Sequence, residues 1–551
     1  MTVQQEAFLR ANGVAYDRLV QAAGELWRSG HAEAALGAVS RAAVFCCAFH
    51  AGRFADGAIE NIAFEIGSTS PHAPAATIRS GTARLDGRRR VLHVLSQVSG
   101  IGGHTRMLYH WMRHDRSSLH CLAVVRQGAR PVPRWLSDAV HAAGGDLTLC
   151  DPRSPQHARA AAIRRIAQHE VDLVVLHHDG GDVVPTVAFA ADGPPVAVLN
   201  HADHAFWLGS SVADAVINLR SAACGHAAER RFARRNAVLP IPLTDTPVPL
   251  ARADARRLLG IPAEQRMLLT IGRSMKYRPC GTYDFIGTAR KILERNRSTH
   301  LYVVGANGAD MAPYIEAPRH ERIHFVGAME DSSAYRAAAD IYLEPFPFGS
   351  NTASLEAALA GLPVVPAYSP LFPLLVAGND SLQDLLSNPP SEDAYIARVG
   401  ELARDAAQRV EFGAALRNKV LSEHVGQGWL DRLASLYRCT DALVHRPAPI
   451  PATTCSTSDA DIGLSLWNVM ADGRTNYRAG VSRDPGALLR HAAFVSKDTG
   501  DYASARRLAA RAVLAGPADP ASWRLLCVSA LGRWGPVARS WLRRTDDTVM
   551  E

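Results

Sequence analysis

Two stretches in the second half of the chain hold residue types that bind phosphate groups. Arg273 and Lys276 lie in a loop after an apolar run over 267–271, which places a guanidinium and an ammonium group at a strand end. Four small or polar residues then open an Ala/Leu-rich helix further along: Gly349, Ser350, Asn351 and Thr352. A helix start presents free N–H groups and the positive end of the helix dipole, and glycine permits close approach of a ligand. The two stretches predict a phosphate-type site, although each alone also fits a capped helix or a solvated loop.

A cluster of ionisable residues follows a predicted strand in the first half of the chain. The strand over 195–200 runs directly into His201, Asp203 and His204. Imidazole accepts a proton readily near neutral pH, and a neighbouring carboxylate can orient it. We therefore expect His201 or His204 to act as a general base with Asp203 in support, against the alternative of a structural, hydrogen-bonded histidine. The spacing does not suit metal ligation from a helix and no cysteine lies nearby, so we expect no metal.

Two other loops carry histidines. The preceding strand ends in His-His-Asp over 177–179, which is a second candidate for the base. A glycine-rich loop after the first strand contains Gly102, Gly103 and His104. Thr105 stands where the third glycine of a dinucleotide-binding Gly-x-Gly-x-x-Gly motif belongs, so that motif fails. The loop suits either close approach of a ligand or a simple tight turn, and we expect it to line a cleft.

Alternating strands and helices must position these residues. Strands are predicted in the first half at 90–96, 119–125, 146–149, 171–177 and 195–200. Strands are predicted in the second half at 267–271, 300–304, 323–326, 341–343 and 364–365. This alternation predicts an α/β fold with two doubly wound, Rossmann-like domains. Ligands in such sheets bind beyond the carboxyl ends of the strands, so we expect the candidate residues to face one cleft.

The domain organisation that we expect has five parts. They are a helical N-terminal domain over 1–85, two Rossmann-like domains over 88–245 and 250–445, a linker over 446–480, and a helical, tetratricopeptide-like segment over 481–551. A proline-rich stretch over 240–249 predicts a hinge between the two Rossmann-like domains. The chain is long enough for several domains, and its hydrophobic fraction of 47% suits buried cores.

Composition narrows the class of protein. The net charge of +7 comes from scattered arginines rather than a concentrated patch, so we expect no nucleic-acid partner. The nine cysteines form no Cys-x-x-Cys pair, which argues against a disulfide framework or a zinc site and favours a reducing cytoplasm. The first residues do not resemble a signal peptide, and no run of about 18 apolar residues predicts a membrane span.

The loop Pro-Phe-Pro-Phe-Gly-Ser-Asn-Thr over 345–352 resembles the phosphate loop of O-GlcNAc transferases and bacterial cytoplasmic N-glycosyltransferases. Its continuation over 354–365 resembles the donor-site helix of family 4 glycosyltransferases. Both groups have the GT-B fold, in which two Rossmann-like domains face each other and the C-terminal one holds most of the nucleotide-sugar. The resemblance covers about 88–445. It implies that Arg273 and Lys276 neutralise the donor diphosphate and that 349–352 hold the phosphate nearest the sugar.

Glu356 lies one turn into the helix, where a carboxylate could accept hydrogen bonds from a ribose. It matches the second glutamate of the family 4 Glu-x7-Glu pattern. The first position of that pattern falls on Phe348, so the carboxylate that usually contacts the sugar is absent. This departure leaves the sugar and any retaining mechanism open.

These observations predict a glycosyltransferase that moves a sugar from a nucleoside-diphosphate sugar to an acceptor held by the N-terminal Rossmann-like domain. By analogy with the families that it resembles, the acceptor could be a polypeptide. Small-molecule and lipid-linked acceptors stay open. We expect no cofactor or metal, because loop cations and a helix dipole serve the diphosphate. Two alternatives are a sugar-nucleotide epimerase of the same fold and a non-catalytic helical-repeat scaffold with a degenerate transferase body.

Overall fold

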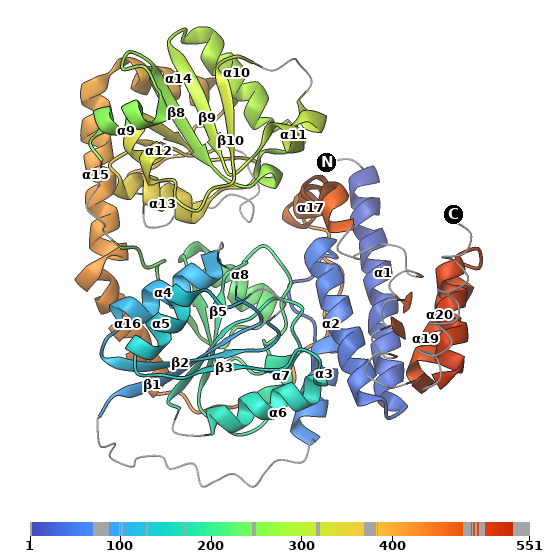
Figure 1. Cartoon of the computed structure of the whole chain (residues 1–551). Coiled ribbons are helices and arrows are strands. Elements are labelled where there is room, and N and C mark those ends of the chain that lie inside the picture. Colours follow the sequence, from blue (N-terminus) through green and yellow to red (C-terminus); the bar gives the residue numbers. More distant parts are fainter. Residues whose placement is uncertain are drawn as a thin grey trace, which may run out of the picture.

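A computed structural model shows two α/β domains stacked on each other, with a helical region along one side of the lower domain (Figure 1). It describes residues 3–69, 87–98, 100, 103–127, 131–168, 171–244, 250–280, 282–315, 320–368, 382, 384–477, 486, 489–490, 493–494, 497 and 502–532. Gly102, which we expect to line the cleft, lies outside these residues. The two expected Rossmann-like domains are confirmed, because each contains one parallel sheet covered by helices.

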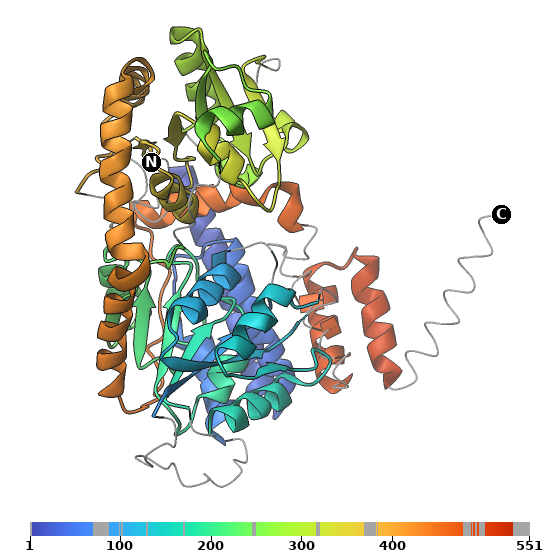
Figure 2. The ribbon, with the colours of Figure 1, turned by 60° about the vertical axis from the view of Figure 1, so that its left-hand side comes forward.

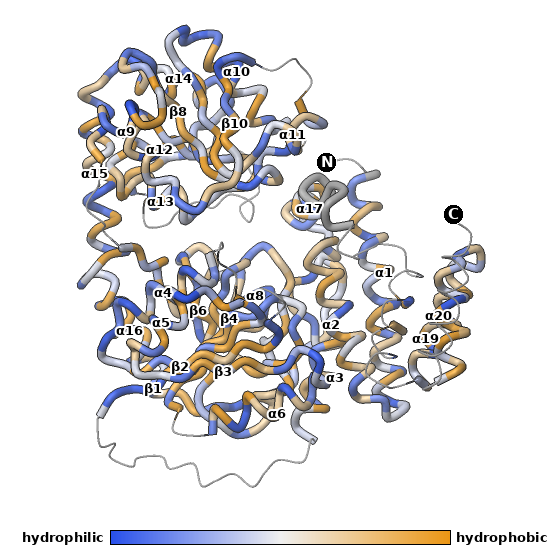
Figure 3. The backbone as a smooth tube through the Cα atoms, in the orientation of Figure 1, coloured by the Kyte–Doolittle hydropathy of each residue, from blue (hydrophilic) through white to orange (hydrophobic). Residues whose placement is uncertain are grey.

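The N-terminal sheet has seven parallel strands in the order β3-β2-β1-β4-β5-β6-β7. The strands are β1 (Arg89–Leu95), β2 (Ser118–Val124), β3 (Leu147–Leu149), β4 (Leu173–His177), β5 (Val196–Asn200), β6 (Ala215–Asn218) and β7 (Asn236–Val238). The helices are α4 (Gly103–His114), α5 (Arg134–Ala142), α6 (Gln156–Ala167), α7 (Val184–Ala188) and α8 (Ala222–Arg231). The central strands β4 and β5 are apolar up to their last residue, as helices on both faces require (Figure 3). The strand order reverses direction between β1 and β4, so a crevice opens there.

The C-terminal sheet has five parallel strands in the order β10-β9-β8-β11-β12. The strands are β8 (Arg266–Ile271), β9 (Thr299–Val304), β10 (Ile323–Gly327), β11 (Ile341–Leu343) and β12 (Val364–Val365). The helices are α9 (Arg252–Leu259), η1 (Ser274–Tyr277), α10 (Phe285–Arg295), α11 (Gly308–Met311), η2 (Ala312–Tyr314), α12 (Ser333–Ala338), α13 (Asn351–Leu359) and α14 (Glu392–Arg404). The order reverses between β8 and β11, the two strands that precede the predicted phosphate-binding stretches.

Two long helices carry the chain back from the C-terminal domain to the N-terminal one (Figure 2). They are α15 (Ala406–His424) and α16 (Gly426–Asp441). Trp429 of α16 meets Trp111 of α4 edge to face, with ring centroids 6.2 Å apart, so α16 completes the N-terminal core. Where the chain turns back, Leu243 donates its N–H to the carbonyl oxygen of His424 at 2.8 Å. The two crossings between the domains are therefore hydrogen-bonded to each other.

The helical region combines both ends of the chain (Figure 1). Its described helices are α1 (Val3–Arg28), α2 (Ala32–Ala48), α3 (Gly57–Thr69), α17 (Asp459–Tyr477), α19 (Tyr502–Ala515) and α20 (Pro520–Ala530). The N-terminal hairpin turns at Gly30, whose φ of 78° lies in the left-handed region that favours glycine. The expected linker over 446–480 instead contains α17, because its apolar residues Leu464 and Trp467 find a buried place near the cleft.

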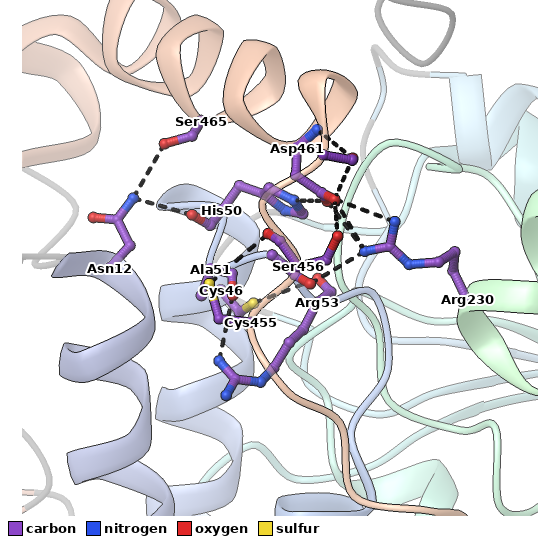
Figure 4. Close-up of polar contacts among 12 residues, drawn as sticks. Asn12, Cys46, His50, Ala51, Arg53, Arg230, Cys455, Ser456, Asp461 and Ser465 are labelled. Carbon is purple, nitrogen blue, oxygen red and sulfur yellow. Dashed lines mark hydrogen bonds and ion pairs between the residues drawn. The ribbon is translucent and has the colours of Figure 1, made fainter. Parts of the chain in front are cut away.

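A polar cluster fixes the start of α17 against the N-terminal helices (Figure 4). Asp461, which is 1% exposed, accepts a hydrogen bond from His50 Nε2 at 2.7 Å and pairs with Arg230 at 3.1 Å. Ser456 also donates to this carboxylate, and these hydrogen bonds outweigh burial and hold the pKa of Asp461 well below its ordinary value. The charged cluster therefore positions α17 beside the cleft.

Candidate functional site

A cavity of about 410 Å³ lies between the two sheets, at the carboxyl ends of their strands. The residues from our sequence predictions that line it are Gly103, His104, His201, Asp203, His204, Arg273, Lys276, Gly349, Ser350, Asn351, Thr352 and Glu356. The loops after β8 and β11, at the switch point of the C-terminal sheet, form one wall. The predicted phosphate-binding and base residues therefore share one site.

The loop after β8 aims two cations at the cavity. Arg273 is exposed there, and among the described residues no carboxylate pairs with it. The Lys276 ammonium group donates to the carbonyl oxygen of Gly349 and lies 4.5 Å from the centre of the Phe348 ring. Burial lowers the pKa of Lys276 to about 8, with Arg273 adding to this effect and the carboxyl group of Glu344 opposing it. Lys276 is thus largely charged at neutral pH and is ready to meet an anion.

The start of α13 presents backbone N–H groups beside these cations. Ser350 occupies the N-cap position, but its hydroxyl makes no capping hydrogen bond. The side-chain oxygen of Asn351 is buried and has no partner within the described structure. A ligand is a natural partner for a helix start whose donors are not used by a cap.

Glu356 lies one turn into α13 and lines the same cavity. Its carboxylate accepts a hydrogen bond from Arg336 of α12 at 3.0 Å, and the two side chains are 26% and 18% exposed. Arg336 therefore orients one carboxylate oxygen, which leaves the second able to accept from a ligand hydroxyl.

His201 forms the centre of the opposite wall. Its ring stacks on that of His104, with centroids 3.9 Å apart and planes 20° apart. Its Nε2 atom lies 3.1 Å from Nδ1 of His177, within hydrogen-bonding distance. Burial, followed by the neighbouring histidines 104, 177 and 178, lowers the pKa of His201 well below its ordinary value. His201 is therefore neutral at pH 7, the state in which imidazole can accept a proton.

Asp203 lies beside His204, one of the two bases that we expect it to support. It forms an ion pair with Arg220, and His204 and Arg220 together hold its pKa below the ordinary value against the effect of burial. Its other oxygen is 3.7 Å from His204 Nδ1, longer than a hydrogen bond. His204 lies edge-on to Phe348 with centroids 4.8 Å apart. The partner that orients His201 is thus a histidine, not this carboxylate.

The second candidate group, over 177–179, is not among the residues that line the cavity. His177 and His178 are 2% and 8% exposed, and His178 donates to the carbonyl oxygen of Leu208. Asp179 pairs with Arg126 at 2.7 Å. His177 and His178 are thus buried, whereas the Asp179 side chain is 39% exposed outside the residues that line the cavity.

Three residues near the site escaped the sequence predictions. Arg220 follows β6, a short strand without a clear turn signal before it, and Arg106 lies on the inner side of α4. Trp467 of α17 stacks on Phe348 with centroids 4.6 Å apart and planes 17° apart. Phe348, which takes a carboxylate's place in the family pattern, is therefore held by an aromatic partner from the helical region. The strand spacing could have indicated Arg220, but nothing in the sequence indicates the stack.

The described residues contain no cluster of three or more histidine, cysteine, aspartate or glutamate side chains that could hold a metal ion. Within the same part of the chain, none of the helices has the length and apolar character needed to cross a bilayer.

Two Rossmann-like domains that face each other across a cavity define the GT-B arrangement. Residues 265–405 match the family model of glycosyl transferases group 1. The match contains both predicted phosphate-binding stretches, from the loop after β8 to the start of α13.

Relatives of known name are distant. A D-inositol 3-phosphate glycosyltransferase of Corynebacterium aurimucosum is 29% identical over 173 residues, which are 29% of this chain and only 40% of that relative. An O-GlcNAc transferase of Thermobaculum terrenum is 17% identical, with a TM-score of 0.47 over 76% of this chain and 82% of that one. Anabaena HepE in complex with UDP and glucose is also 17% identical, with a TM-score of 0.46 over 64% of this chain and 99% of that one. Both TM-scores lie below 0.5 and define no activity.

Proposed function

We propose that this protein is a glycosyltransferase that moves a sugar from a nucleoside-diphosphate sugar to an acceptor in the cavity. One observation carries the proposal: two cations and the uncapped start of α13 converge on the cavity within the segment that matches group 1 glycosyl transferases. The diphosphate would lie against Arg273, Lys276 and the α13 N–H groups. These groups would stabilise the negative charge that develops as the nucleoside diphosphate leaves.

The opposite wall supplies the proton acceptor. A neutral imidazole at His201 would take the proton of the attacking acceptor group. The epimerase alternative gains no support from the site, because the two acidic side chains of the cavity wall, Asp203 and Glu356, are tied to Arg220 and Arg336. We also propose that the acceptor is a polypeptide and that the reaction needs no cofactor or metal. We propose that the protein works in the reducing cytoplasm, where its nine free thiols would persist.

The test is a thermal-shift panel of nucleoside diphosphates and nucleotide-sugars on the whole chain. We expect at least one of them to raise the melting temperature, because a ligand that binds only the folded state stabilises it. Arg273→Ala and Lys276→Ala should each weaken this binding by about 10-fold to 100-fold, as expected for a hydrogen bond to a charged group. Lys291→Ala is the matched control, since Lys291 belongs to the same domain but pairs with Glu392.

A nucleotide that stabilises the wild type and Lys291→Ala equally, but not the two cleft variants, supports the site. If no nucleotide stabilises the wild-type protein, the proposed function is wrong.

A further inference from the structure

A line of hydrogen-bonded histidines crosses the N-terminal sheet and ends at the cavity. Its members, in order, are His120 of β2, His93 of β1, His177 of β4 and His201 after β5. The distance from His120 Nδ1 to His93 Nε2 is 3.0 Å, and that from His93 Nδ1 to His177 Nε2 is also 3.0 Å. His177 Nδ1 then lies 3.1 Å from His201 Nε2. His93 and His177 thus each use one ring nitrogen for the preceding histidine and the other for the next one.

The strand register explains the line. His93 lies two residues beyond Val91, the register partner of His120. His177 is in turn the partner of Leu95, two residues beyond His93. Residues two apart in a strand point to the same face, and diagonal neighbours on adjacent strands are within reach. On β5, Val198 is the register partner of Leu176, so His201 lies two residues beyond the position opposite His177. The line therefore runs diagonally towards the carboxyl edge of the sheet, where the cavity lies.

The far end of the line is a buried carboxylate. His120 Nε2 lies 3.2 Å from the backbone oxygen of Asp115 and 3.2 Å from its Oδ2 atom. Tyr437 of α16 donates to the same Oδ2 atom at 2.6 Å, and Ser117 donates to Oδ1 at 2.7 Å. Asp115 is 2% exposed, and its hydrogen bonds favour the ionised form. Both oxygen atoms that face His120 Nε2 can only accept, so this nitrogen carries the proton.

A neutral imidazole has one donor nitrogen and one acceptor nitrogen. The position of the proton on His120 therefore determines the tautomer of every other histidine in the line. With the proton on His120 Nε2, its Nδ1 accepts from His93 Nε2, and His93 Nδ1 accepts from His177 Nε2. His177 Nδ1 then accepts from His201 Nε2. His201 Nδ1 is left as a lone pair, and no hydrogen bond to it is found in the described part of the chain.

We propose that Asp115, His120, His93 and His177 are positioning residues that hold His201 in the tautomer whose Nδ1 accepts the proton in the cavity. The catalytic part of this inference rests on the proposed function, whereas the tautomer itself does not. In the transfer step the proton of the acceptor group moves to His201 Nδ1, and the acceptor atom bonds to the sugar carbon. The nucleoside diphosphate leaves with the electron pair of the broken bond to the sugar. A carboxylate that orients a histidine and stabilises its charged form is the logic of the serine-protease triad, extended here through three rings.

The first test reads the tautomer without any turnover. Nitrogen NMR of protein labelled with ¹⁵N only in its histidine rings distinguishes a protonated from an unprotonated ring nitrogen, and His201→Asn assigns the signals of His201. We expect the proton on Nε2 and a bare Nδ1 in the nucleotide-free wild-type protein at pH 7.5. A proton on Nδ1 overturns the proposal.

The second test breaks the line one ring away from His201. His93→Phe keeps an aromatic ring in the core but interrupts the line of hydrogen bonds. We therefore expect a fraction of the molecules to carry the His201 proton on Nδ1. We also expect kcat to fall at least 10-fold with little change in KM for the nucleotide-sugar. His93→Gln keeps one donor and one acceptor and should restore most of kcat. His300→Phe is the matched control, because His300 forms a similar 3.0 Å pair with His324 in the C-terminal sheet, away from the cavity.

If His93→Phe behaves like His300→Phe in both the spectrum and kcat, the line does not position His201. Should His93→Phe fail to fold, the wild-type spectrum decides. Failure of the proposed function would appear separately, as the absence of nucleotide binding by a protein whose spectrum still shows the expected tautomer.

Discussion

The two walls of the cavity come from sheets of the same kind but carry opposite chemistry. The C-terminal wall offers Arg273, Lys276 and the open start of α13, all of which favour negative charge. Two imidazoles of the N-terminal wall, His104 and His201, are kept neutral by burial. Both walls lie at carboxyl strand ends, near switch points in the strand order. The fold thus determines where a ligand binds, and the residues after a few strands determine what each wall can do with it.

The largest effect that would test this contrast is on turnover. His201→Asn should lower kcat by about 10²-fold to 10⁴-fold, the usual contribution of a general base, while nucleotide binding stays unchanged. His204→Asn is the matched control, because its imidazole packs against Phe348 and does not join the histidine line. Steady-state kinetics with thermal shifts separate the two quantities. Equal loss of turnover in both variants would place the base elsewhere.

A second, smaller effect concerns nucleotide binding at high pH. Burial lowers the pKa of Lys276 to about 8, so its positive charge is present below that pH and is lost above it. Affinity for a nucleoside diphosphate should therefore fall above pH 8, by at most about 10-fold per pH unit. Titration calorimetry from pH 7 to 9.5 measures this. Lys276→Arg should remove the fall, since arginine stays charged; an unchanged alkaline fall in that variant would exclude Lys276 as its source.

The smallest effect is on stability at low pH and comes from His177, which contacts His201 but does not itself line the cavity. Burial lowers the pKa of His177 to about 3, while the unfolded chain takes up the same proton near its ordinary value of 6.5. Between these values the unfolded state binds more protons. This contribution to the free energy of unfolding is therefore complete above pH 6.5 and is lost as the pH falls towards 3, at a slope of at most about 1.4 kcal/mol per pH unit.

Urea denaturation from pH 7.5 to 4.5 measures this slope, and His177→Gln should make it shallower. A slope that is the same in wild type and variant would show that other groups carry the acid sensitivity.

Much of the fold could be predicted from the sequence because its signals are local. Short apolar runs alternate with amphipathic helices, and this pattern is enough to indicate two parallel sheets. The strands β6 and β7 escaped prediction; β7 is an edge strand whose three residues are exposed or half-buried, so it lacks a buried apolar run. The helix α17 escaped because it follows a stretch rich in Pro, Ser and Thr, and its place depends on distant partners such as His50 and Arg230.

The residues of the candidate site that follow strand ends could also be predicted from the sequence, but their partners could not. Residues next to strand ends, such as Lys276 and His201, could be assigned to a cleft because parallel strands end at one edge. The partner of His201 could not be identified, because it depends on the register of β4 against β1 and β5. In the sequence Asp203 is the nearer carboxylate, and only the structure shows that Arg220 engages it.

The paired crossings at Leu243 and His424 have a mechanical consequence. Two chain segments joined by a hydrogen bond connect the domains on one side. The easiest relative motion of the domains is therefore a hinge rotation about that side. In the view of Figure 1, α17 lies on the opposite side, where such a rotation would open the cavity most. There Trp467 of α17 stacks on Phe348 of the C-terminal domain. Entry and exit of large ligands would therefore require this aromatic contact to separate before the hinge can turn.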